Sequence, residues 1–128
     1  MQNLQEYVEQ CIADLSGPNS FKARHSLVEA GAAALPLVIE AFDTAQDPRI
    51  RLSLVELISE YRSNEAIPFL QKTLQDKSAA IWKAALDGLV ILGTPEALHA
   101  LHVSRATAPD AQRWLLDEAM QQINEGLE

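Results

Sequence analysis

The chain has 128 residues, of which 48% are hydrophobic and 22% are charged, as in an ordinary globular domain rather than a disordered chain. Its single cysteine excludes an internal disulfide, and no apolar run approaches the length of about 18 residues that a membrane span needs. The net charge of −8 disfavours nucleic acid as a partner, because that affinity comes largely from Lys and Arg that release counterions. We therefore expect one domain over residues 1–128, no nucleic-acid or membrane partner, and a cytoplasmic location.

The first helix is predicted at residues 3–15, where apolar residues recur at helical spacing. Cys11 falls on its apolar side and is expected to be a buried small hydrophobe rather than a reactive thiol. The segment from Met1 to Leu15 is acidic and lacks the basic start and apolar run of a leader. The helix is expected to end at Gly17, in the left-handed conformation, before Pro18.

A second helix, at about residues 21–30, is expected to take its N-cap from the loop through Asn19 and Ser20 and to stop at Gly31. The helix that follows carries an apolar stripe formed by Leu35, Val38, Ile39 and Phe42. Pro36 and Pro68 occupy the same place in the first turn of two successive units, where the free N–H groups tolerate proline. These two helices form the first predicted pair.

Asp47 and Pro48 form the clearest helix start in the chain. The aspartate can accept hydrogen bonds from the free N–H groups of the first turn, and proline at the first helical position loses no bond there. The helix is expected to run to about Arg62, which stands in place of a turn glycine. Asn64 is then expected to cap a further helix at about residues 65–75.

The last three helices follow the same rules. Ser78 is expected to cap a helix that stops at Gly93, and Thr94 with Pro95 starts a shorter one. Trp114, in the final helix, is expected to pack against its neighbours. The apolar stripe of this helix is formed by Leu116, Met120, Ile123 and Leu127. Its polar and acidic far side is typical of a helix that caps the end of a repeat array.

One segment of the chain occurs twice: Arg-His-Ser-Leu-Val-Glu at residues 24–29 returns as Arg-Leu-Ser-Leu-Val-Glu at residues 51–56. A weaker third copy follows, because the apolar positions of residues 50–70 mostly fall on apolar positions of residues 81–101. Self-similarity at a spacing of about 20 to 50 residues indicates stacked helical units. We predict an all-α solenoid of about three helix pairs between two capping helices. The N-terminal cap, the three pairs and the C-terminal cap cover residues 3–15, 20–43, 47–75, 78–104 and 109–125.

Three stretches follow a known repeat pattern: Asp47-Pro48-Arg49-Ile50-Arg51, the spacing of Leu54, Leu57, Ile58 and Tyr61, and Leu92-Gly93-Thr94-Pro95-Glu96-Ala97-Leu98. With these residues, roughly residues 20 to 104 resemble the HEAT-like repeat family, in particular the short-unit type first described in phycobilisome lyases. The resemblance implies a superhelix in which the second helix of each pair lines a concave face. The family includes scaffolds, adaptors, inhibitors and a minority of enzymes, so the resemblance predicts fold better than function.

The concave face implied by this resemblance has a mixed surface, which suits a protein or peptide and argues against a groove for a phosphate backbone. Trp82 is a further candidate because tryptophan is common among residues that dominate binding energy, although packing across a gap between units is an equal alternative. The expected partner-binding residues are Glu40, Asp43, Gln71, Lys72, Gln75, Trp82, His99 and His102.

His99 and His102 lie three residues apart on one predicted helix, a spacing that could supply half of a zinc site. No cysteine cluster or His-Glu-x-x-His pattern accompanies them, so we expect solvated side chains and no metal or cofactor. His25 is expected to be a packed or partly exposed helix residue rather than a general base.

The matched arginines, Arg24 and Arg51, are expected to pair with acidic residues of a neighbouring unit and to fix the stacking; an anion site is the alternative. Glu29 and Glu56 are the candidate acidic partners. Nothing near these glutamates in the sequence supplies a nucleophile, a glycine-rich loop or a second acid held at a fixed distance, so we do not expect catalysis.

The two ends of the chain are acidic, whereas its middle is close to balanced. Such a charge favours a basic protein partner, mainly through faster encounter. The leading prediction is a small, non-enzymatic protein-interaction module, an adaptor or scaffold, that binds its partner through the inner helices or through the acidic ends. Two narrower alternatives are a bacterial immunity or antitoxin protein that neutralises a toxin, and an accessory subunit of a bilin (phycobilisome) lyase. The oligomeric state is left open.

Overall fold

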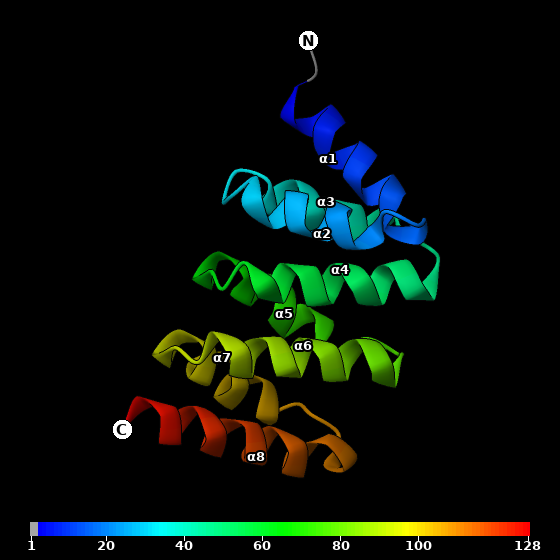
Figure 1. The fold of residues 1–128 in the computed structure, drawn as a ribbon. Helices are drawn as coiled ribbons and strands as arrows, with labels where there is room; N and C mark the ends of the chain where they lie inside the picture. Colours follow the sequence, from blue (N-terminus) through cyan, green and yellow to red (C-terminus); the bar gives the residue numbers. More distant parts are fainter. Residues whose placement is uncertain (1–2) are drawn as a thin grey trace. The chain divides into compact units, whose positions relative to one another are not determined.

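A computed structural model describes residues 3–128, which form α-helices and two short turns of 3₁₀ helix and contain no strand (Figure 1). The predicted all-α class is confirmed. Met1 and Gln2, part of the expected domain of residues 1–128, lie outside the described residues. The elements are α1 (Leu4–Ala13), η1 (Asp14–Ser16), α2 (Ser20–Glu29), α3 (Leu35–Thr44), α4 (Pro48–Glu60), η2 (Asn64–Ala66), α5 (Ile67–Thr73), α6 (Ala79–Leu92), α7 (Pro95–Arg105) and α8 (Asp110–Leu127).

The chain forms two compact units, and each is described by itself. The first unit ends at Tyr61 and the second begins at Arg62. In the first unit α1 packs against α2 and α3, while α4 packs against α2 and α3. In the second unit α6 and α7 each pack against α5 and α8, and against each other.

Polar side chains cap two helices of the first unit. The Asn3 side chain accepts a hydrogen bond from the Glu6 N–H at 2.8 Å, and Asp47 accepts one from the Arg49 N–H at 2.9 Å, as predicted for α4. The N-cap of α2 is Asn19, which belongs to the predicted loop, although its side chain makes no capping hydrogen bond.

Two glycines of the first unit were predicted to end helices, and only one of them has the left-handed conformation. Gly31 has a φ of 83° after α2, as expected. Gly17 has a φ of −109°, so its predicted left-handed conformation is wrong. The reason is that α1 tightens into η1, where the Gly17 N–H bonds to the Asp14 carbonyl at 3.1 Å and no reversal of φ is needed.

The repeated segment buries its leucine and exposes its glutamate at matched positions of both copies. Leu27 on α2 and Leu54 on α4 are each 0% exposed, and Glu29 and Glu56 are each at the surface. Cys11 is buried, as predicted. The buried apolar side chains of this unit include Val8, Leu15, Ala23, Ala34, Leu35, Val38, Phe42, Val55, Leu57 and Ile58. Sequence similarity here therefore corresponds to equivalent packing.

Helix starts in the second unit are set by Ser and Thr side chains. Ser78 accepts from the Ile81 N–H at 3.4 Å and Thr94 from the Ala97 N–H at 3.1 Å, as predicted. The prediction that Asn64 caps the next helix is wrong. Ser63 caps instead, because the helical turn η2 begins before α5. Asn64 is therefore free to bond to another element of the unit.

Trp114 is 62% exposed, so the prediction that it packs is wrong. It precedes the buried Leu116 by two residues, which at about 100° per residue places it on the other side of α8. Leu127, expected on the apolar stripe, is also exposed at the helix end. The stripe that does pack consists of Leu116, Ala119, Met120 and Ile123.

Arg62 has a φ of 50°, a conformation that an L-residue with a Cβ adopts at a cost. Glycine has no such cost, so we expect Arg62→Gly to raise the free energy of unfolding by about 0.5–1 kcal/mol, measured by urea denaturation. Arg62→Ala is the matched control, because it removes the side chain but keeps the Cβ. Equal stability of the two variants would contradict this explanation.

Candidate functional site

The predicted partner-binding residues lie in both units. Glu40 and Asp43 are exposed on α3 of the first unit. The other six belong to the second unit. Three of these, Gln71, Lys72 and Gln75, line one groove of about 410 Å³ beside α7. The structure therefore brings these three together within the second unit.

The remaining predicted residues do not line that groove. His99 and His102 are exposed on α7. Trp82 is half-buried on α6, and the Lys83 ammonium lies 5.7 Å from its ring centroid. Among residues 3–128, no group of three or more His, Cys, Asp or Glu side chains is placed to hold a metal ion.

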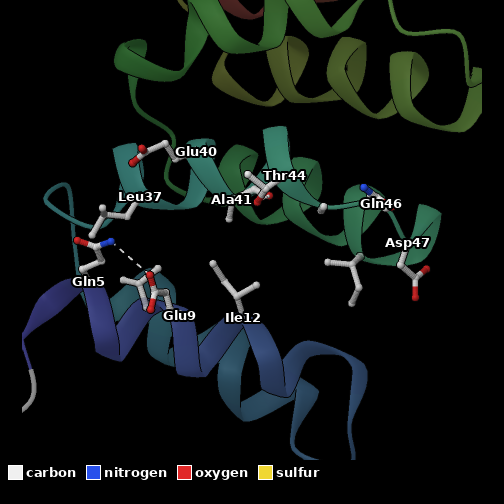
Figure 2. A pocket seen from close by; sticks show the side chains of 12 residues that line it. Gln5, Glu9, Ile12, Leu37, Glu40, Ala41, Thr44, Gln46 and Asp47 are labelled. Atoms are coloured by element: carbon white, nitrogen blue, oxygen red, sulfur yellow. Dashed lines mark hydrogen bonds between the residues drawn. The ribbon is translucent and has the colours of Figure 1, made fainter.

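The first unit contains a groove of about 510 Å³ between α1 and α3, and the start of α4 lines one part of it. Figure 2 shows Ile12 of α1 pointing into the space below α3, with Glu9 and Leu37 near one end and Asp47 at the other. The groove is lined by Gln5, Val8, Glu9, Ile12, Leu37, Glu40, Ala41, Thr44, Ala45, Gln46, Asp47 and Ile50. Aliphatic side chains from three helices thus form its floor.

All charged residues that line this groove are acidic: Glu9, Glu40 and Asp47. Glu9 accepts a 3.3 Å hydrogen bond from the Gln5 side chain, and Asp47 caps α4. Both bonds come from uncharged donors and leave the negative charge in place. Glu40 has no hydrogen bond or ion pair to any residue of the range 3–128. The surface is therefore apolar in the middle and negative at its margin.

The sequence predicted Glu40 as a site residue and placed Glu9 in an acidic end through which a partner could bind, but it did not predict Ile12 or Asp47 as site residues. Asp47 was predicted only as a helix start. The available signal was charge, because neither α1 nor α3 contains a Lys, Arg or His. What the sequence could not give was the packing of α1 on α3 that brings the two acidic helices together.

A second groove of the second unit, about 580 Å³, lies where α5 and α7 end and α8 begins. Its charged lining residue is Asp76, and most of its other polar groups are amides and hydroxyls. The residues that line it are Leu74, Gln75, Asp76, Ser104, Thr107, Ala108, Pro109, Gln112 and Leu116. The grooves of the second unit are therefore less strongly charged than that of the first.

The predicted ion pair between successive repeats is confirmed for Arg24. Its guanidinium on α2 lies 3.0 Å from Glu60 and 3.9 Å from Glu56, both on α4. Arg51 stacks over the Phe42 ring, with 4.5 Å from Cζ to the centroid. The other expected acid, Glu29, pairs with His25 at 3.0 Å within α2. The two Arg24 pairs join α2 to α4, and each such surface pair contributes little to stability.

Arg105 of α7 binds Asp117 of α8 through two hydrogen bonds of 2.6 and 3.2 Å. The hydrogen bond from Arg105 lowers the pKa of Asp117 below its ordinary value of 3.8. Because the folded pKa is depressed, the pair stabilises the fold above the unfolded pKa and loses that effect as pH falls through the folded pKa. We expect Arg105→Gln to raise the Asp117 pKa toward 3.8 in a carboxyl NMR titration. An unchanged titration curve would contradict the pairing.

None of the helices described between residues 3 and 128 is both long and apolar enough to cross a membrane. A family model described as HEAT repeats matches residues 35–120, which is well over half of the chain. No curated protein and no solved structure gives a significant match.

Proposed function

Because the chain belongs to the HEAT-repeat family, whose helix pairs generally serve as protein-interaction modules, we propose that it is a non-enzymatic module that binds a partner protein with a basic surface. The observation that carries this proposal is the acidic groove of the first unit. Its aliphatic floor offers burial to an apolar side chain, and its three carboxylates favour a positively charged neighbour.

The distribution of charge supports the same proposal. Arg24, Arg105 and Arg113 are each already paired with carboxylates of the chain. Their positive charge is locally compensated, while the net charge is −8. A partner approaching this chain therefore meets a negative potential, which speeds the encounter of a basic protein and slows that of an acidic one.

Two narrower functions follow from a binding role of this kind. A toxin-neutralising immunity protein would bind a basic toxin, which the charge favours. A bilin-lyase subunit would need to hold a tetrapyrrole with anionic propionates, which the acidic margin of the first unit's groove would repel. We therefore place the toxin-binding role ahead of the lyase role. The cytoplasmic location expected from the sequence stays a prediction.

The test is affinity capture from the source organism on the immobilised chain, at about 0.05 M and about 0.5 M salt, because salt screens surface charge. Captured proteins are identified by mass spectrometry, and each is then purified and titrated against the chain. The proposal expects direct binding of a basic protein that weakens as salt rises. Direct binding only of acidic proteins, unaffected by salt, would contradict it.

A further inference from the structure

We propose that the groove between α1 and α3 receives one amphipathic helix of the partner, with its apolar stripe on the groove floor and Lys or Arg side chains beside the stripe. This proposal rests on the proposed function and adds the place and the chemistry of binding. It concerns the first unit alone, whose residues form the whole groove.

The size and the floor of the groove fit such a helix. Its volume of about 510 Å³ is within the range of about 300–1,000 Å³ that is typical of ligand-binding pockets. α1 and α3 have 10 residues each and so are about 15 Å long, enough to accompany about three turns of a bound helix. An amphipathic helix presents apolar side chains at positions i, i+3, i+4 and i+7, the spacing that fills a groove between two helices. The aliphatic floor consists of Val8, Ile12, Leu37, Ala41 and Ile50.

The negative charge at the margin of the groove favours a basic helix over other ligands. Glu9, Glu40 and Asp47 carry the only charges of the lining residues, and none of them has a cationic partner in the groove. Arg49 and Arg51 belong to α4, whose start lines the groove, but they are not among the lining residues. Because like charges repel, an acidic helix, a phosphate backbone or an anionic lipid surface is disfavoured here. A helix with Lys or Arg next to its apolar stripe complements both floor and margin.

The probe is a synthetic peptide about four turns long, with Leu at i, i+3, i+4 and i+7 and Lys at the flanking positions. Two control peptides have the same composition in scrambled order, or Glu in place of each Lys. Binding is measured by fluorescence anisotropy and mapped by amide NMR shifts on the whole chain. We expect the Lys peptide alone to bind, with shifts at residues 5–12 and 37–50.

Filling the floor tests the site without removing a packed side chain. Ala41→Leu places a larger side chain in the groove, whereas Ala80→Leu makes the same change at an exposed position of α6. We expect Ala41→Leu to weaken peptide binding about tenfold through steric exclusion, and Ala80→Leu to leave it unchanged. Thermal unfolding of both variants confirms that each is folded.

Neutralising the margin tests the charge. The triple variant Glu9→Gln, Glu40→Gln and Asp47→Asn keeps the cap of α4, because asparagine also caps helices. Its matched control neutralises three exposed carboxylates of the second unit, through Asp87→Asn, Glu118→Gln and Glu125→Gln. Glu125 accepts from Gln121 as Glu9 accepts from Gln5, so the two sets are similar in local bonding. We expect about tenfold weaker binding only for the groove variant.

Several results would overturn the proposal: no binding of the Lys peptide, equal binding of the scrambled peptide, or equal loss in the two triple variants. Self-association that Ala41→Leu abolishes would make a second copy the occupant and would also overturn it. A basic partner captured equally by wild type and Ala41→Leu would reject the groove but leave the proposed function standing. Absence of any directly binding basic partner would instead reject the proposed function.

Discussion

Replacing Leu27 or Leu54 by alanine is expected to lower the free energy of unfolding by about 2–5 kcal/mol, the range for large-to-small changes in a packed core. Both side chains are 0% exposed and occupy the same position in successive copies of the repeated segment. The loss combines the apolar contacts of the leucine with the cavity that alanine leaves. Since domains of this kind are stable by about 5–15 kcal/mol, either change removes a large share of the total. Urea denaturation followed by circular dichroism measures it.

Leu52→Ala is the matched control for this experiment. Leu52 lies on the same helix, α4, two residues before Leu54, and is only half-buried. We expect its loss to be well below that of Leu54→Ala, because less apolar surface returns to water. An equal loss of unfolding free energy in Leu52→Ala and Leu54→Ala would mean that the position in the repeat does not determine which leucine contributes most to packing.

Tyr61→Phe is expected to lower the free energy of unfolding by about 1–3 kcal/mol, the cost of leaving a buried polar group unpaired. The Tyr61 hydroxyl donates a hydrogen bond to the carbonyl of Leu27, near the end of α2. The Gly31 N–H bonds to Val28 instead, so this carbonyl belongs to the last turn that a helix leaves open. Thermal or urea unfolding of the variant measures the loss, with Tyr7→Phe as the control at an exposed site.

The same tyrosine gives a test in alkaline solution. Burial raises the pKa of Tyr61 from 10.0 to about 12, with a smaller contribution from Cys11. Because the folded pKa is the higher one, the stabilisation is complete below pH 10 and is lost as pH rises toward 12. We expect wild type to lose stability over this interval more steeply than Tyr61→Phe. Parallel pH profiles for the two proteins would contradict the buried hydrogen bond.

Helix starts and repeats could be predicted because they depend on local chemistry. Asp47, Ser78 and Thr94 each cap the helix that follows, as the sequence indicated, since a cap requires only a short side chain and the N–H groups next to it. Arg62 was recognised as occupying a glycine position, and its φ of 50° agrees with this. The duplicated segment likewise predicted equivalent buried positions.

The helix ends that were predicted wrongly lie where a 3₁₀ turn adjoins an α-helix. Gly17 and Asn64 were assigned to α-helix ends, but 3₁₀ turns intervene and shift the bonding by a residue or more. Asn64 then takes a tertiary role within the second unit. It accepts from the Thr94 hydroxyl at 2.9 Å and donates to Glu96 at 3.3 Å. Such a contact spans about thirty residues and leaves no local signature in the sequence.

The candidate site was only partly predictable for a related reason. Glu40 was predicted because it lies on an inner helix of the repeat, but Ile12 and Glu9 of α1 also line the groove. Periodicity shows which side of α1 is apolar, and it does not show that part of this side stays uncovered beside α3. Only the packing of two particular helices decides how much apolar surface is left at a groove floor.

Amide hydrogen exchange of the chain with and without its captured partner tests whether a basic partner binds at the groove of the first unit. We predict slower exchange of α1 and α3 in the complex, over residues 4–13 and 35–44. Slower exchange confined to α6, α7 and α8, with α1 and α3 unchanged, would contradict it.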